Sequence, residues 1–163
     1  MARTEEHNNL SPAEKQSVFR EAYGRIKSYR SEQNFIAAHT LAAALLEDRV
    51  MSSYFLHLKS IGHTEFNEKK INRTPISVIA RRIRAVGMIY EDTFDRLNDC
   101  FQERNQLVHQ MIWRAREFND ESVERVLNAS RLVDNALRRY ARAMKKQVTQ
   151  STDKSSNGET GIS

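Results

Sequence analysis

The chain has 163 residues, of which only five are glycine and two are proline. So few turn-forming residues argue against a fold of many short strands, whereas 39% hydrophobic and 29% charged residues are typical of a small helical domain with solvated outer faces. A net charge of +5 permits a polyanionic partner such as RNA but does not require one.

Neither a secretory signal nor a membrane span is predicted. Residues 1–10 are polar and are expected to form a flexible N-terminus, and the longest apolar run, Leu41 to Leu46, is too short to cross a bilayer. The single cysteine, Cys100, cannot form an internal disulfide. We therefore expect a reducing compartment and interpret Cys100 as a small core residue rather than a reactive thiol. Together these features predict a soluble, cytoplasmic protein.

Two helices are predicted in the first part of the chain. Ser11 is expected to cap the first helix and Glu14 to complete a capping box, which places this helix over about 12–29. Ser31 is a candidate cap for a second helix over about 32–59, which has a broad apolar side. The polar stretch that follows, 64–73, is expected to be a loop.

The middle of the chain predicts either two helices or one bent helix. Thr74 and Pro75 open a helical pattern over about 75–90, and a second pattern runs over about 93–114. The residues of the first pattern that are expected to face inward are Ile76, Ile79, Ile83, Val86 and Tyr90. The sequence leaves open whether residues 75–114 bend or break between the two patterns.

A last helix is predicted over about 121–146, capped by Asn119 and Asp120, and a disordered polar tail is expected over 148–163. The predicted fold is all-α. A single domain over 11–147 is expected to form an up-and-down antiparallel bundle of four main helices, with one of them open to being split.

An arginine interrupts an apolar stripe in the predicted helix over 93–114. The stripe recurs at spacings of three and four residues, through Phe94, Leu97, Phe101, Val108 and Met111. Arg104 occupies the position that the stripe would use between Phe101 and Val108. Because a charged side chain on a buried face is unfavourable without a partner, either the helix ends or bends here, or this face opens onto a polar cleft.

Arg104, Asn105 and His109 supply the groups that metal-free phosphodiester chemistry needs. An always-charged guanidinium suits a phosphate, and an imidazole that titrates near neutral pH suits proton transfer. On a continuous helix Asn105 and His109 are neighbours, while Arg104 and His109 lie about 140° apart and about 7.5 Å apart along the axis, so they would flank a groove. The structural alternative is an Arg–Asn–His hydrogen-bond network at a helix end.

This motif, together with the helix layout over about 11–147, resembles the HEPN superfamily (higher eukaryotes and prokaryotes nucleotide-binding). The family motif is an arginine, a polar residue directly after it, and a histidine separated from the arginine by four to six residues. Arg104, Asn105 and His109 match it, with four residues between the arginine and the histidine. The resemblance implies an up-and-down helical bundle that pairs as a homodimer, with the motifs of two subunits meeting at a cleft. The chemistry that the resemblance implies needs neither a metal nor another cofactor.

The function implied by the resemblance is endoribonuclease activity in a toxin, a defence system or RNA processing. His109 would act in proton transfer at the ribose 2′-hydroxyl, Arg104 would hold the scissile phosphate, and Asn105 would orient His109 or a phosphate oxygen. The alternative is a non-catalytic dimer of the same fold that binds nucleotide, RNA or a protein partner. An antitoxin or other regulatory protein is a further expected partner, but the tyrosine found two positions after the histidine in adenylylated family toxins is Met111 here.

Three other residues are candidates for the same site. A carboxylate at Glu47 or Asp48 is expected to pair with Arg104 from the second helix and align it, the alternative being a solvated patch. Trp113 lies just beyond the motif and is either a base-stacking side chain or a buried or interface residue.

Two basic clusters and three further histidines are the remaining candidates for functional residues. One basic cluster is Arg81, Arg82 and Arg84; the other, on the last helix, is Arg138, Arg139, Arg142, Lys145 and Lys146. Each either follows an RNA backbone or forms an ordinary solvated face. His39 is interpreted as a packed or interface residue, and His57 and His63 as helix-end histidines. None of them has metal-ligand spacing with the cysteine, so no metal site is predicted.

Overall fold

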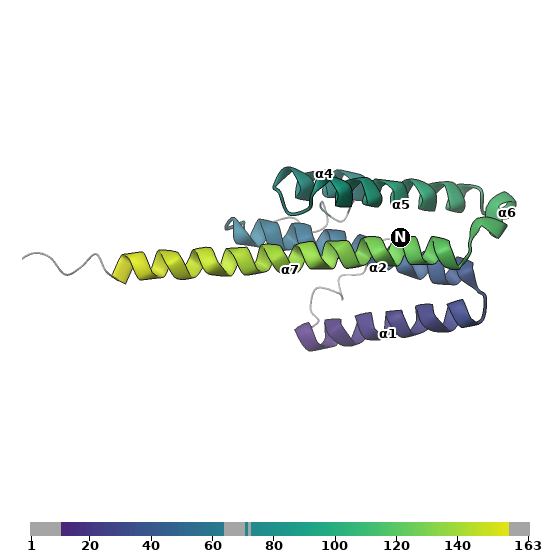
Figure 1. The fold of residues 1–163 in the computed structure, drawn as a ribbon, viewed down its shortest axis with the longest axis horizontal. Helices are drawn as coiled ribbons and strands as arrows, with labels where there is room; N and C mark the ends of the chain where they lie inside the picture. The colour runs from purple at the N-terminus through teal and green to yellow at the C-terminus, as the bar shows by residue number, and fades with distance from the viewer. Residues whose placement is uncertain (1–10, 64–70, 72, 157–163) are drawn as a thin grey trace, which may run out of the picture.

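The computed structural model describes residues 11–63, 71 and 73–156, and these residues contain helices but no strand. The all-α prediction is therefore confirmed for the described part of the chain. In chain order the helices are α1 (Pro12–Ser31), α2 (Phe35–Ser60), α4 (Ile76–Ala85), α5 (Glu91–His109), α6 (Met111–Arg114), the 3-10 helix η2 (Ala115–Glu117) and α7 (Asp120–Ser156) (Figure 1). The predicted flexible N-terminus, 1–10, and most of the predicted loop over 64–73 lie outside the described residues.

The start of α1 is as predicted, but the start of α2 is not. Ser11 and Glu14 form a reciprocal capping box, with the Ser11 amide donating to the Glu14 carboxylate at 2.7 Å. Helix α1 continues to Ser31, whose hydroxyl donates to the Ser28 carbonyl instead of capping α2. The chain then reverses through Gln33, with φ of 57°, and Asn34 caps α2 by accepting from the Ala37 amide at 3.2 Å.

Helix α2 is the central element of the fold. It contacts α1, α4 and α7, and its contact with α7 is the most extensive between any two described elements. Its side chains Ala38, Ala42, Leu46 and Val50 recur every four residues and are fully buried. Figure 1 shows α1 and the α4–α5 segment on opposite sides of the α2–α7 pair.

Residues 75–114 form separate helices rather than one bent helix. Helix α4 ends at Ala85, and Gly87 adopts φ of 71°, a left-handed conformation that favours glycine. Because the helix ends before the predicted residue 90, Val86 and Tyr90 are exposed, contrary to the inward orientation predicted for them. Met88 and Ile89 in the connecting turn are buried in their place.

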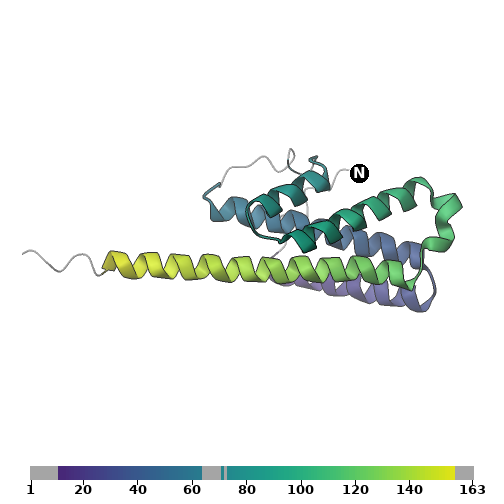
Figure 2. The ribbon, with the colours of Figure 1, turned by 45° about the horizontal axis from the view of Figure 1, so that its top comes forward.

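Helix α7 is longer than predicted. The Ser122 amide donates to the Asn119 side chain at 2.9 Å, which is the cap expected at this end. The helix continues to Ser156, so its end lies beyond the predicted limit of 146 and within the stretch expected to be a disordered tail. Both Figure 1 and Figure 2 show its C-terminal end extending past the other helices. Within the described residues, no helix combines the length and the apolar character needed to span a membrane.

The single cysteine lies in the core, as predicted. Cys100 is buried where α5 meets α7, and its thiol donates to the Arg125 carbonyl at 3.9 Å. Burial is the main cause that raises the pKa of this thiol to about 11.

We expect a thiol reagent at pH 8 to modify Cys100 at least about 100-fold more slowly in the native protein than in urea, because the higher pKa lowers the thiolate fraction by about that factor. Equal rates in the two conditions would contradict the buried placement.

Candidate active site

Arg104 lies where the apolar stripe of α5 leaves the core. Phe94, Leu97 and Phe101 are buried, whereas Val108, the next apolar residue of the stripe after Arg104, is 49% exposed. The interruption therefore marks the point at which this face of the helix passes from the core to a surface. The sequence offered two explanations for a charged residue in the stripe: an end or bend of the helix, or a face that opens onto a cleft. At Arg104 the helix continues and its face opens to the surface, so the second explanation holds there. The helix ends five positions later, at His109.

The Arg104 guanidinium is held by two neighbours. Its Nη2 lies 3.2 Å from Glu47 Oε1 on α2, and its Nη1 donates to Asn105 Oδ1 at 3.2 Å. The Arg104 side chain is still 41% exposed, so part of the guanidinium surface reaches solvent. Glu47 thus makes the cross-helix ion pair expected of a carboxylate in this segment. Asp48 lies about 100° further around α2 and accepts a hydrogen bond from Ser52 on its own helix.

Consecutive residues of α5 reach to different helices. Glu103 pairs with Arg125 of α7 at 2.6 Å, while Arg104 pairs with Glu47 of α2. Because neighbouring positions on a helix differ by about 100°, these two ion pairs flank the buried side of α5. They are compatible with only one rotation of the helix, the one that its buried side chains set, and therefore with one direction in which the motif faces.

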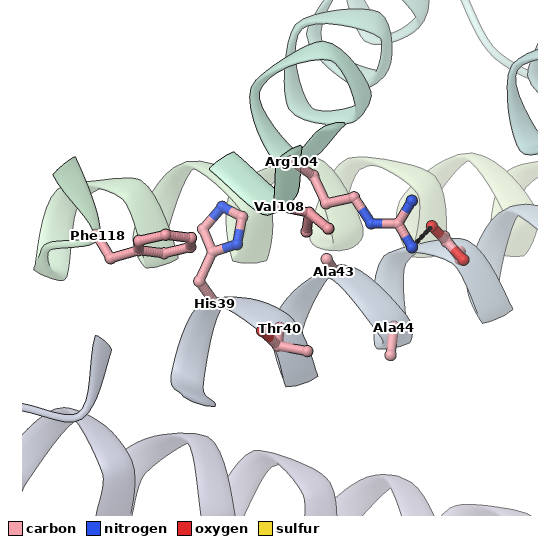
Figure 3. A pocket seen from close by; sticks show the side chains of 8 residues that line it. His39, Thr40, Ala43, Ala44, Arg104, Val108 and Phe118 are labelled. Atoms are coloured by element: carbon pink, nitrogen blue, oxygen red, sulfur yellow. Dashed lines mark ion pairs between the residues drawn. The ribbon is translucent and has the colours of Figure 1, made fainter. Parts of the chain in front are cut away.

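A pocket of about 150 Å³ lies beside Arg104, between α2 and α5. It is lined by His39, Thr40, Ala43, Ala44, Glu47, Arg104, Val108 and Phe118. Figure 3 shows Arg104 and its ion pair at one end of this pocket and His39 with Phe118 at the other. The polar cleft inferred from the stripe is thus a small, mostly apolar pocket with charged groups at one end.

His39 is a pocket residue that the sequence did not single out. It is only 1% exposed, in agreement with the packed position expected for it, and its ring meets the Phe118 ring edge-on at a centroid distance of 5.3 Å. Its Nε2 is buried and has no hydrogen-bond partner among the described residues. Burial lowers the pKa of His39, with Arg125 and Arg104 acting in the same direction and Glu103 opposing them.

His109 is exposed at the last position of α5 and is not part of the pocket. On this helix Asn105 and His109 share one face, next to the face that carries Arg104 and Val108. The structure therefore brings Arg104 together with Asn105 and Glu47. It leaves His109 on the adjoining exposed face, where it flanks the arginine without touching it.

No family model, curated protein or solved structure matches this chain. The likeness to HEPN proteins accordingly rests on Arg104, Asn105 and His109 and on the helices that carry them.

The exposed surface next to the motif contains a tryptophan. Trp113, on the short helix α6, is 88% exposed, which excludes a buried position within the chain and leaves stacking or an interface. Arg114 Nη1 donates to Gln106 Oε1 at 3.0 Å and so connects α6 to the last turns of α5. Trp113 therefore lies at the same end of the molecule as Val108 and His109, the last two residues of α5.

The two basic clusters differ in size. The cluster on α7 comprises Arg138, Arg139, Arg142, Lys145 and Lys146, all exposed. In the cluster on α4, Arg84 pairs with Glu91 at 2.5 Å and Arg82 Nη1 donates to the Tyr54 hydroxyl at 3.1 Å. Both clusters make contacts within the chain, since Arg139 stacks over the Tyr90 ring. The α7 cluster, with five exposed cations along one helix, is the larger and therefore the better candidate for contact with a polyanion.

The remaining histidines and carboxylates do not form a metal site in the described part of the chain. His57 Nδ1 lies 2.9 Å from the Tyr140 hydroxyl, which makes it a link between α2 and α7. No group of three or more histidines, cysteines or carboxylates is placed to hold a metal ion there.

Proposed function

We propose that the protein is a HEPN-like, metal-independent endoribonuclease that works as a homodimer in the cytoplasm. The observation that carries the proposal is the half-exposed arginine Arg104, which Glu47 and Asn105 hold and which the exposed His109 flanks on the adjoining face of α5. An up-and-down four-helix bundle of the HEPN type, with two motifs meeting at a dimer cleft, is part of the proposal. Toxin, defence or RNA-processing roles, with an antitoxin or other regulator as partner, are compatible with it.

The proposed reaction uses a nucleophile that the substrate itself provides. The RNA 2′-oxygen attacks the adjacent phosphorus, His109 takes the 2′-hydroxyl proton, and the bond to the 5′-oxygen breaks. The 5′-oxygen leaves with a proton from water, and the other fragment carries a 2′,3′-cyclic phosphate. Arg104 has five N–H donors, and those not used by Glu47 and Asn105 can hold the phosphate oxygens as negative charge develops on them.

The basic cluster on α7 supports RNA as the substrate. Its exposed cations, Arg138, Arg139, Arg142, Lys145 and Lys146, follow one helix, and Arg139 also stacks over the exposed Tyr90 ring at 4.9 Å. Cations spaced along a helix attract a phosphate backbone without reading its sequence.

A second function is favoured by a different observation. Trp113 and the neighbouring Val108 are large apolar side chains left exposed, and exposed aromatic residues are enriched in interfaces. The alternative proposal is a non-catalytic helical dimer that uses this surface to bind nucleotide, RNA or a protein partner.

Cleavage chemistry separates the two proposals. The purified protein is incubated in EDTA with mixed tRNA and mRNA and with one matched oligonucleotide pair, of which one member carries 2′-O-methyl groups throughout. We expect cleavage of the unmodified RNA only, with 2′,3′-cyclic phosphate and 5′-hydroxyl ends, because the methyl group blocks the nucleophile. Absence of cleavage by a protein shown to be dimeric by sedimentation would favour the binding function.

A further inference from the structure

Tyr90 is an exposed aromatic side chain on a well-anchored backbone. It follows the buried turn residues Met88 and Ile89 and directly precedes α5, where its carbonyl accepts from the Phe94 amide at 3.0 Å. Its side chain makes no capping hydrogen bond, although this position before a helix usually carries a small polar residue that does. The ring is 63% exposed. Neither capping nor core packing therefore accounts for a tyrosine at this position.

Arg139 of α7 covers one face of the Tyr90 ring. Its guanidinium carbon lies 4.9 Å from the ring centroid, where the turn between α4 and α5 reaches α7 (Figure 2). Because the ring is 63% exposed with a cation over one face, its other face is open to solvent. An open aromatic face beside a cation is the arrangement on which unpaired nucleic-acid bases stack.

The cations next to Tyr90 lie on one face of α7. Arg139, Arg142 and Lys146 are exposed and follow one another at spacings of three and four residues. Residues 135–152 contain no aspartate or glutamate, so no carboxylate of this stretch offsets the positive charge. Over residues 120–134, by contrast, each carboxylate of α7 pairs with an arginine. A helix face of one charge sign beside an aromatic ring differs from an ordinary solvated face, which mixes both signs.

An anionic membrane is the other polyanion that a basic helix can bind. A helix that lies in a membrane surface needs a broad apolar face with large side chains that enter the lipid. On the face through Arg139, Arg142 and Lys146, the exposed apolar residue is Ala143, whose methyl group is too small for this. The surface therefore fits a nucleic-acid strand better than a membrane.

We propose that Tyr90 is a stacking platform for a base of single-stranded RNA whose backbone follows Arg139, Arg142 and Lys146 along α7; the choice of RNA rests on the proposed ribonuclease function. The platform is separate from the motif, because the fourteen positions from Tyr90 to Arg104 correspond to about 20 Å along α5.

Carboxylates on α5 set the direction of the strand. Asp92, Asp95 and Asp99 are exposed on this helix and repel a phosphate backbone. The strand is therefore expected to run from Tyr90 along α7 rather than along α5.

Binding of an uncleavable strand tests the platform apart from the cleavage reaction. Fluorescence anisotropy of the full-length protein in EDTA measures binding of a labelled 2′-O-methyl oligonucleotide of about twelve nucleotides, a length within the usual range of site sizes. The oligonucleotide is used alone and annealed to its complement. We expect the single strand to bind at least about tenfold more tightly than the duplex, because bases in a duplex stack on one another and offer no free face.

Variants of Tyr90 test the ring itself. Tyr90→Ala is expected to weaken single-strand binding by about tenfold, the size of effect seen when one base loses its aromatic partner. Tyr90→Phe keeps the ring and is expected to bind within about twofold of the wild type. Since Tyr90 is exposed, both variants are expected to keep the fold, which circular dichroism checks. Neither variant changes the charge, so the salt dependence of binding is expected to stay the same.

The cations are tested by that salt dependence. Arg142→Ala is expected to make the slope of log affinity against log salt concentration less steep by about 0.7, the value for one phosphate contact on a single strand. The matched control is Arg20→Ala, which removes the same charge from an exposed position on α1. Figure 1 shows α1 on the side of the α2–α7 pair opposite the α4–α5 segment, so this slope is expected to equal that of the wild type.

Three results would overturn the platform: Tyr90→Ala binding within about twofold of the wild type, equal binding of single strand and duplex, or binding of phosphatidylserine vesicles without Tyr90-dependent binding of the strand. Failure of the ribonuclease gives a different result. Tyr90-dependent strand binding by a protein that cleaves no RNA would support the platform and contradict the ribonuclease, whereas RNA cleavage with Tyr90-independent binding would do the reverse.

Discussion

The variant His109→Ala is expected to cleave RNA about 10²- to 10⁴-fold more slowly than the wild type, the range over which a positioned general acid or base contributes to rate. His109 is exposed at the end of α5, so its loss creates no cavity and leaves the fold intact. The measurement is the initial rate of cleavage of one RNA oligonucleotide in EDTA, with the dimer content of each preparation determined by sedimentation.

A matched control separates this effect from the loss of an exposed histidine in general. His63 is also exposed, just beyond the end of α2, and His63→Ala is expected to cleave at the wild-type rate. If His109→Ala retained activity within about threefold of the wild type while remaining dimeric, proton transfer would have to be assigned to another group.

The variant Leu97→Ala is expected to lower the free energy of unfolding by about 3 kcal/mol, within the usual range of 2–5 kcal/mol for a buried leucine. Leu97 is fully buried on α5, two helical turns before Arg104. The loss combines the transfer free energy of the removed carbons with the cost of the cavity left behind. Urea denaturation followed by circular dichroism measures it, provided the slope of the transition is unchanged.

Val108→Ala is the matched control on the same stripe. Val108 is half exposed beside the pocket, so its truncation is expected to cost less than about 1 kcal/mol. Similar losses for Leu97→Ala and Val108→Ala would mean that the stripe does not leave the core at Arg104. The proposed opening onto a pocket would then be wrong.

Local sequence signals predicted the helix ends that depend on local chemistry. The capping box of Ser11 and Glu14 needs only residues within one turn, and it forms as expected. The start of α2 was missed because Ser31 and Asn34 are both good capping residues, and the choice between them depends on the reversal through Gln33. Gly87 is a local signal for the break after α4, but the apolar pattern that continues through Val86 and Tyr90 masks it.

The candidate site was predicted only in part, for a similar reason. Arg104 was conspicuous because it conflicts with the periodicity of its own helix, and its pairing with a carboxylate on α2 follows from the need to balance a half-buried charge. The pocket could not be predicted from the sequence, because it forms only when the fold brings His39, Val108 and Phe118 together from distant parts of the chain. The spacing of His39, Ala43 and Glu47 by four residues was the one local sign that they share a face.

The paired contacts of Glu103 and Arg104 have a consequence for how this protein can change over evolution. Each residue inserted into or deleted from α5 between Leu97 and Glu103 would rotate everything after it by about 100° and shift it by about 1.5 Å. Such a change would separate Glu103 from Arg125 and Arg104 from Glu47 at once, and would turn the motif away from its present surface. Relatives that keep the site should therefore vary in residue type along this segment but not in its length.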